Sequence, residues 1–346
     1  MKCTDPRNLL LSVCVMALVT GCSQFRPTST GTTTNPSSPQ PSPPPPSYSV
    51  GVSLSRPSVI VGTNGWGPTQ VYKATDSGTA PPYASLEGCL PAVDGQGNVY
   101  LLAFHFPYGC GYYPSSIDVY PSNAVGGASH IRSLPVGPGN KIANVQNMAV
   151  SPEGEIFVND GKGVAVFSAS ATGADAPVRY IQWDGGGNTP VTPGIMAVDG
   201  KDNLYVQNGL SIAVFGPGDT GLVVPSRVIS GSHTQLAGLG GMTTDAQGNL
   251  YVTLTLNPHG VLEFAAGANG DAVPLRFVSS PSMWNFDGIL GVAVDSSGLI
   301  YVRANEGYCG AVFVFAADAS GTTDPLRVLA GQEPPCYDFD GTIAVF

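Results

Sequence analysis

A short phrase recurs six times along the chain, and this repeat limits the fold more strongly than any other feature of the sequence. In five copies a turn containing Gly or Asn follows, and then an aromatic strand such as "GQGNVYLL" or "AQGNLYVT". The copies are Ala92-Val93-Asp94, Ala149-Val150-Ser151, Ala197-Val198-Asp199, Thr243-Thr244-Asp245, Ala293-Val294-Asp295 and Ala344-Val345-Phe346. Successive copies lie 46 to 57 residues apart, so the chain repeats a unit of about 50 residues.

Each unit contains four candidate strands. The third reads "GVAVF", "SIAVF" or "AVFVF", and the fourth carries a Pro-x-Arg triplet, whose proline suits the start of an edge strand. The chain holds 45 Gly and 31 Pro but only 11% charged residues, a composition typical of short strands joined by tight turns. Four such strands per repeat predict the blades of an all-β propeller. The predicted blades lie near residues 90–134, 147–181, 195–231, 241–278 and 291–331.

The two ends of the repeat region predict a sixth, composite blade. The segment "SGTAPPYASLEG" (77–88) matches "SGTTDPLRVLAG" (320–331), which ends a unit. Residues 50–88 are therefore expected to hold outer strands, and residues 341–346 to supply the inner strand. Pairing between them closes a six-bladed ring and removes the open sheet edges that favour aggregation.

The Ala-Val-Asp phrase, its Gly/Asn turn and the aromatic strand resemble NHL-repeat β-propellers and, more loosely, the SMP-30-like group. The resemblance covers residues 50–346 and implies a six-bladed propeller. It also implies an alternative activity, because SMP-30-like lactonases and some NHL-like lyases use a metal cation at the mouth of the central channel. The cation ligands of the SMP-30-like group have no residue-by-residue match in this sequence.

The N-terminus has the pattern of a bacterial export signal. Basic residues precede an apolar run, Leu9–Val19, that is short for a membrane span. The next residues complete "VTGC" (19–22), which resembles the lipobox of bacterial lipoproteins, in which the cysteine is lipidated after cleavage. The resemblance implies a signal peptide over 1–21, a lipidated Cys22, and a lipid-anchored protein at the outer membrane or cell surface. An ordinary signal peptide is the alternative.

Residues 22–49 contain mostly Pro, Ser and Thr, including "PQPSPPPPS". They offer little apolar surface to bury and are predicted to form a disordered or polyproline-II linker. The formal net charge of the whole chain is −10 at pH 7, and no Lys/Arg cluster is present. This charge disfavours nucleic acid and anionic lipid surfaces as partners.

Blade topology divides the connections between two faces of the ring. The first and third connections of a blade lie on the short-turn face, and the second connections and the crossings between blades lie on the irregular-loop face. Aromatic and acidic residues collect in the irregular loops, where binding groups are often placed on a rigid scaffold. Such side chains suit sugar stacking or a protein hot spot. The candidates are Tyr108, Tyr112, Tyr113, Trp183, Asp184, Trp284, Asp287, Tyr308, Tyr337, Asp338 and Asp340.

Four cysteines lie in the predicted propeller, an even number in what we expect to be an oxidising compartment. They are Cys89, Cys110, Cys309 and Cys336. Four cysteines allow three pairings, of which local proximity favours Cys89–Cys110 and Cys309–Cys336. We interpret them as disulfide staples of the long loops.

No residue pattern predicts catalysis. The chain lacks the zinc-protease helix motif, a nucleophile elbow, a phosphate-binding loop and a Cys-x-x-Cys pair. The repeated Asp before each tight turn is interpreted as a turn cap, and the Pro-x-Arg arginines as structural ties. No cofactor is predicted. Weak candidates for a divalent cation site are His105, His233, His259, Asn305 and Glu306.

These features favour a monomeric binding or scaffold protein over an enzyme. An envelope protein or a carbohydrate is the expected partner. A metal-dependent lactonase or lyase is the alternative, and a structural envelope protein without a discrete ligand comes third.

Overall fold

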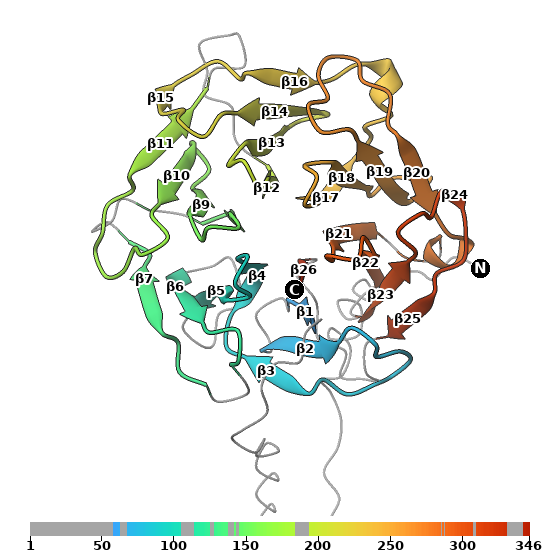
Figure 1. Ribbon diagram of the computed structural model, residues 1–346, viewed down its shortest axis with the longest axis horizontal. Helices are drawn as coiled ribbons and strands as arrows, with labels where there is room; N and C mark the ends of the chain where they lie inside the picture. Colours follow the sequence, from blue (N-terminus) through green and yellow to red (C-terminus); the bar gives the residue numbers. More distant parts are fainter. Residues whose placement is uncertain are drawn as a thin grey trace, which may run out of the picture. The chain divides into compact units, whose positions relative to one another are not determined.

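Six sheets surround a central axis and form the blades of a propeller (Figure 1). A computed structural model describes residues 58–62, 68–104, 114–124, 128–137, 142, 145–183, 194–284, 286, 288–306, 309–330 and 342–346. All of them lie in the unit 48–346, one of two units into which the chain divides. The arrangement confirms the all-β, six-bladed propeller that the repeat predicts.

We number the blades in chain order, with the composite blade first. Blade 1 contains β26 (Ile343–Val345), β1 (Ser58–Val61), β2 (Thr69–Lys73) and β3 (Ala84–Leu86). Blade 2 contains β4 (Cys89–Val93), β5 (Val99–Phe104), β6 (Pro114–Tyr120) and β7 (Arg132–Pro135). Blade 3 contains β8 (Asn147–Val150), β9 (Ile156–Asn159), β10 (Val164–Phe167) and β11 (Arg179–Gln182).

The remaining blades repeat the same order from the axis outwards. Blade 4 contains β12 (Met196–Val198), β13 (Leu204–Asn208), β14 (Ser211–Phe215) and β16 (Arg227–Ile229). Blade 5 contains β17 (Leu239–Thr244), β18 (Leu250–Leu254), β19 (Gly260–Phe264) and β20 (Arg276–Ser279). Blade 6 contains β21 (Gly288–Val294), β22 (Ile300–Glu306), β23 (Cys309–Phe315) and β25 (Arg327–Ala330). In the described ranges the helical segments are two 3-10 turns, η2 (Ser232–Thr234) and η3 (Pro281–Met283), and no helix is long and apolar enough to span a membrane.

Blade 1 closes the ring with strands from both ends of the propeller. β26 pairs antiparallel with β1, so that Val345 lies opposite Val59. The backbone N–H of Ser58 donates to the carbonyl oxygen of Phe346 at 2.9 Å, and the return bond measures 3.3 Å. The predicted pairing of the N-terminal outer strands with the C-terminal inner strand is therefore confirmed.

Short extensions clamp neighbouring blades together at the outer rim. β15 (Gly221–Leu222) leaves blade 4 and pairs parallel with β11 of blade 3. β24 (Gly321–Thr322) of blade 6 pairs in the same way with β20 of blade 5. Gly221 has a φ of +75°, a conformation that glycine adopts without steric cost. The clamps cover outer strand edges that would otherwise be open to pairing with another chain.

The core lies between the blades, because each sheet packs on both of its faces. All residues of β9 and β10 are buried, and so are those of β18 and β19. Phe157 of blade 3 and Phe215 of blade 4 belong to one apolar cluster. Burial on two faces explains why these strands are nearly continuous apolar runs instead of alternating ones.

The Asp of the repeated phrase caps the first turn of four blades. Asp94 Oδ1 accepts hydrogen bonds from the backbone N–H groups of Gln96 and Asn98 at 2.9 Å each. Its Oδ2 accepts a bond from the Tyr100 hydroxyl at 3.2 Å. Equivalent carboxylate–hydroxyl pairs are Asp199–Tyr205, Asp245–Tyr251 and Asp295–Tyr301. Each of these aspartates serves its own blade, as the sequence predicts.

The arginine of the fourth strand extends this chain of bonds to the next blade. Arg132 donates to the Tyr100 hydroxyl at 2.8 Å and to the carbonyl oxygen of Ala171 in blade 3 at 3.0 Å. Arg227 makes the same two kinds of contact in blade 4. Burial raises the pKa of Tyr100 to about 12, so its hydroxyl stays protonated and can donate to Asp94. The arginines are structural ties, as predicted.

Blade 3 replaces both members of the carboxylate–hydroxyl pair, with Ser151 for the Asp and Phe157 for the Tyr. A carboxylate is supplied instead from blade 4, where Asp202 occupies a turn position that is glycine in other blades and hydrogen-bonds to Ser151. Asp202 keeps the positive φ of that turn, +59°. Arg179 in turn pairs with Glu155 at 2.9 Å.

The turn glycine of blade 3 lies against the Asp–Tyr pair of blade 2. Gly154 of blade 3 has a φ of +93°. A Cβ atom there would lie 2.9 Å from the Tyr100 hydroxyl and 3.6 Å from the Asp94 carboxylate. Asp202 meets neither group, because blade 3 has Ser151 and Phe157 in their place. The departures in blades 3 and 4 are therefore coupled.

This coupling predicts that Gly154→Asp lowers the free energy of unfolding by at least about 2 kcal/mol, since it adds backbone strain, a close contact and a second carboxylate beside Asp94. Asp202→Gly is the matched control. It should change stability by less than about 1 kcal/mol, because one lost hydrogen bond is offset by release of the strained φ and of a partly desolvated carboxylate. Urea denaturation measures both variants, and equal effects would contradict the coupling.

Ring closure predicts losses of different size for proline substitutions at two adjacent positions of β26. The Ser58–Phe346 pair exchanges both backbone bonds, so the next bonded pair is Ile60–Ala344, and the Val345 N–H points away from β1. Ala344→Pro should lower the free energy of unfolding by about 3 kcal/mol, and Val345→Pro by much less. Thermal melting monitored by circular dichroism tests this. If both variants melt like wild type, the closing pair is not needed for stability.

Candidate functional site

The irregular-loop face carries exposed apolar side chains on blades 4, 5 and 6. Strand order places the β13–β14 turn, the β18–β19 turn and the β20–β21 crossing on this face. Leu210, Leu256 and Trp284 lie in these three connections and are 62%, 59% and 52% exposed. Large apolar groups on loops of one rigid face form a candidate binding surface.

Local bonding holds Trp284 in place. The preceding residues form η3, whose start is capped by the Ser280 hydroxyl accepting from the Ser282 N–H, and whose Met283 side chain is fully buried. The Trp284 indole N–H donates to the Ser279 hydroxyl at 3.3 Å. The indole is therefore presented to solvent from an anchored turn, which lowers the entropy lost when it binds a partner.

The prediction that Trp183 belongs to the binding face is wrong, because its side chain is not exposed. It is 2% exposed and lies against Phe215 of blade 4, with ring centroids 4.8 Å apart. The ring fills space between blades 3 and 4, where the apolar cluster also contains Phe157 and Ile181. Its role is in packing.

Most other predicted binding residues fall outside the described residues. These are Tyr108, Tyr112, Tyr113, Asp184, Asp287, Tyr308, Tyr337, Asp338 and Asp340, together with Cys22, Cys110, Cys336 and His105. Cys89 is buried at the start of β4, and Cys309 begins β23. The two cysteine pairings stay predictions.

The candidate cation ligands that are described have separate partners. His233 Nδ1 lies 2.6 Å from Asp271 Oδ2 between blades 4 and 5, and this hydrogen bond lowers the pKa of Asp271. His259 is buried in the β18–β19 connection of blade 5. Asn305 Oδ1 accepts from Arg303 at 3.2 Å, and Glu306 ends β22. Over the described ranges no three His, Cys, Asp or Glu side chains come together as a metal site requires.

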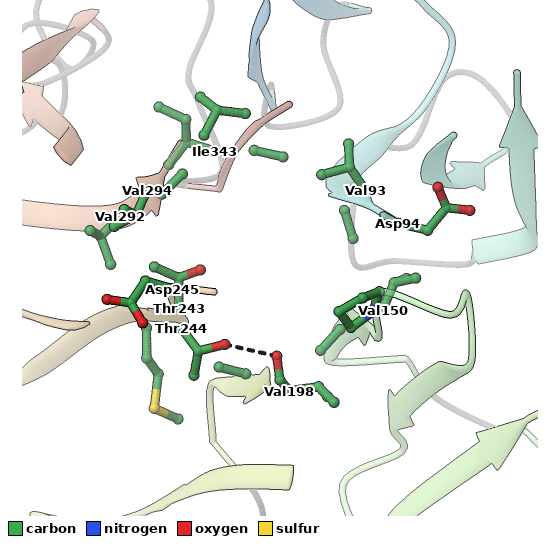
Figure 2. A pocket seen from close by; sticks show the side chains of 18 of the residues that line it. Val93, Asp94, Val150, Val198, Thr243, Thr244, Asp245, Val292, Val294 and Ile343 are labelled. Carbon is green, nitrogen blue, oxygen red and sulfur yellow. Dashed lines mark hydrogen bonds between the residues drawn. The ribbon is translucent and has the colours of Figure 1, made fainter. Parts of the chain in front are cut away.

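The apolar lining of the central channel was not predicted from the sequence. Its turn-side cavity, at the short-turn end, has a volume of about 330 Å³ and is lined by the ends of the six inner strands. Figure 2 shows Val93, Val150, Val198 and Val294 around it. Thr244 takes the place of valine in blade 5, and its hydroxyl donates to the Val198 carbonyl oxygen at 3.0 Å. A loop-side cavity of about 240 Å³ lies at the other end.

Arg303 is a second feature that sequence reasoning missed. Its side chain is 1% exposed in β22, between blades 6 and 1. The guanidinium donates to the carbonyl oxygens of Ala304 at 2.7 Å and Ala311 at 3.2 Å. Gly310 leaves room for it, since a Cβ atom there would overlap the guanidinium. The available sequence signal was a glycine, Gly310, in the strand that pairs with β22, two positions from the residue opposite Arg303.

Comparison with solved structures finds distant relatives of the fold. A protein of unknown function from Bacteroides caccae aligns with a TM-score of 0.53 and 12% identity, over 84% of this chain and 99% of that one. A putative 6-phosphogluconolactonase from Bacteroides fragilis aligns with a TM-score of 0.49 and 14% identity, over 84% of this chain and 98% of that one. Streptogramin B lyase aligns with a TM-score of 0.42 and 10% identity, over 80% of this chain and 74% of that one. No protein-family model and no curated protein matches the chain. These likenesses concern the fold alone.

The contrast between the two tryptophans gives a stability prediction. Trp183→Ala should lower the free energy of unfolding by about 3–5 kcal/mol, because it empties a packed site between blades 3 and 4. Trp284→Ala should change it by less than about 1 kcal/mol, since the ring is half exposed. Chemical denaturation compares the two variants. A similar loss for both would contradict the surface placement of Trp284.

Proposed function

We propose that this chain is a lipid-anchored, extracytoplasmic binding protein that engages an envelope protein or glycan through its irregular-loop face. The observation that supports the proposal most directly is the anchored and half-exposed indole of Trp284. Tryptophan is enriched at protein hot spots and stacks on sugar rings, because it offers a large, rigid surface with a polar edge.

The neighbouring surface supports the same proposal. Leu210 and Leu256 add exposed apolar area on the same face. The rigid ring below these loops fixes their spacing, so that binding would require little reorganisation. The chain is proposed to act as a monomer, with disulfides Cys89–Cys110 and Cys309–Cys336 holding the long loops.

The membrane anchor is a separate part of the proposal. Lipidation at Cys22 would place the propeller outside the cytoplasm, at the outer membrane or cell surface, with residues 22–49 as the spacer. The expected result is incorporation of radiolabelled palmitate into the wild-type chain in cells. Cys22→Ser should abolish it, and unchanged labelling of that variant would contradict the anchor.

The binding face is tested by affinity capture from a solubilised envelope fraction, followed by titration of the purified partner. Trp284→Ala should weaken binding at least about 10-fold, as expected for a hot-spot residue. Val224→Ala is the matched control, because Val224 is 82% exposed but lies at the outer rim of blade 4. It should bind as wild type.

Two outcomes would contradict the proposal. One is a partner whose affinity is equal for Trp284→Ala and wild type, because the irregular-loop face would then not carry the contact. The other is the absence of any protein or glycan that the wild-type chain binds saturably. Metal content and lactone hydrolysis would then test the lactonase or lyase alternative.

A further inference from the structure

The turn-side and loop-side cavities meet inside the central channel. Six residues line both cavities, one from each inner strand: Pro91, Met148, Met196, Met242, Val292 and Ile343. All six are apolar. The channel is therefore lined at its middle by a ring of apolar side chains contributed by all six blades.

The repeated phrase places a second apolar ring closer to the short-turn face. In blade 4, Ala197 is buried against the neighbouring blade, whereas the next residue, Val198, is partly exposed. Val198 lies beside the cavity in Figure 2, as do Val150 and Val294. Valines of the second and third strands, such as Val206, are fully buried. The channel thus keeps apolar surface in contact with solvent, and covering that surface is favourable at about 25 cal/mol per Å².

The turn-side cavity offers no positively charged side chain to an anionic ligand. Its lining contains no Lys, Arg, His or Glu. Its two carboxylates, those of Asp94 and Asp245, already accept hydrogen bonds from the backbone N–H groups of their own turns. Its hydroxyls are those of Thr243 and Thr244, and the latter is bonded to Val198. A ligand here would meet valine, alanine and methionine side chains beside the backbone edges of the inner strands, and no positively charged side chain.

We propose that the turn-side cavity binds a small, uncharged, predominantly apolar molecule. Its volume of about 330 Å³ lies within the usual range for small-molecule pockets, roughly 300–1,000 Å³. Binding of such a molecule would cover apolar side chains of the cavity that otherwise stay in contact with water. This site is distinct from the irregular-loop face and does not depend on the partner proposed above.

The probe for the test is N-phenyl-1-naphthylamine, an uncharged two-ring amine whose fluorescence rises in apolar surroundings. The full chain carries Cys22→Ser in all samples, so that no detergent is needed. Saturable binding with one site is expected. The sulfonated analogue 1-anilinonaphthalene-8-sulfonate has the same ring skeleton and a negative charge, and it should bind at least 10-fold more weakly.

Variants in blade 4 locate the site. Val198→Phe fills the cavity and should weaken binding of the uncharged probe at least 10-fold. Val224→Phe makes the same change at the outer rim and should leave binding unchanged. Thr244→Val completes the valine ring, so it should tighten binding about 2- to 5-fold, and it keeps the test informative if Val198→Phe fails to fold.

Each alternative result would overturn the proposal. No saturable binding of the uncharged probe would mean that the cavity does not take apolar molecules. Equal binding by Val198→Phe and Val224→Phe would place the probe elsewhere, as would a Thr244→Val variant no tighter than wild type. Equal affinity for the sulfonated analogue would contradict the argument from charge.

Discussion

The pairing of β26 with β1 is the contact on which the rest of the propeller depends. Every blade buries its two faces against two neighbours, so opening one junction exposes two sheet faces at once. At this junction Tyr301 and Val312 of blade 6 share an apolar cluster with Val59 and Val345 of blade 1. The Ser58–Phe346 backbone bonds hold those surfaces together, which couples the ends of the described chain to the stability of the whole ring.

Hydrogen bonds that cross between blades give this ring its rigidity. The Asp–Tyr–Arg chain joins the first, second and fourth strands of one blade and reaches a carbonyl group of the next. In blade 3 the change to Ser151 and Phe157 is accompanied by Asp202 in the following blade. Substitutions in a repeat protein of this kind should be judged against the adjoining repeat.

The rigid ring leaves two kinds of surface free to bind. One is the irregular-loop face, where η3 presents Trp284 on a turn anchored by Met283. The other is the channel, whose lining follows from the repeated phrase and therefore has nearly the same chemistry in every blade. The first surface suits recognition of a particular partner, because its loops differ. The second suits a molecule recognised by size and polarity.

The sequence by itself determined the number of blades, the closing pair and the turn-capping role of the aspartates, because each depends on a local pattern repeated at a regular spacing. It did not determine which irregular-loop side chains are exposed. Trp183 and Trp284 each follow a fourth strand, but Phe215 of the next blade covers the first, and η3 turns the second towards solvent. The apolar channel and the buried Arg303 likewise became visible only in the folded ring. Contacts between blades decide these features, and such contacts join residues that no local pattern relates.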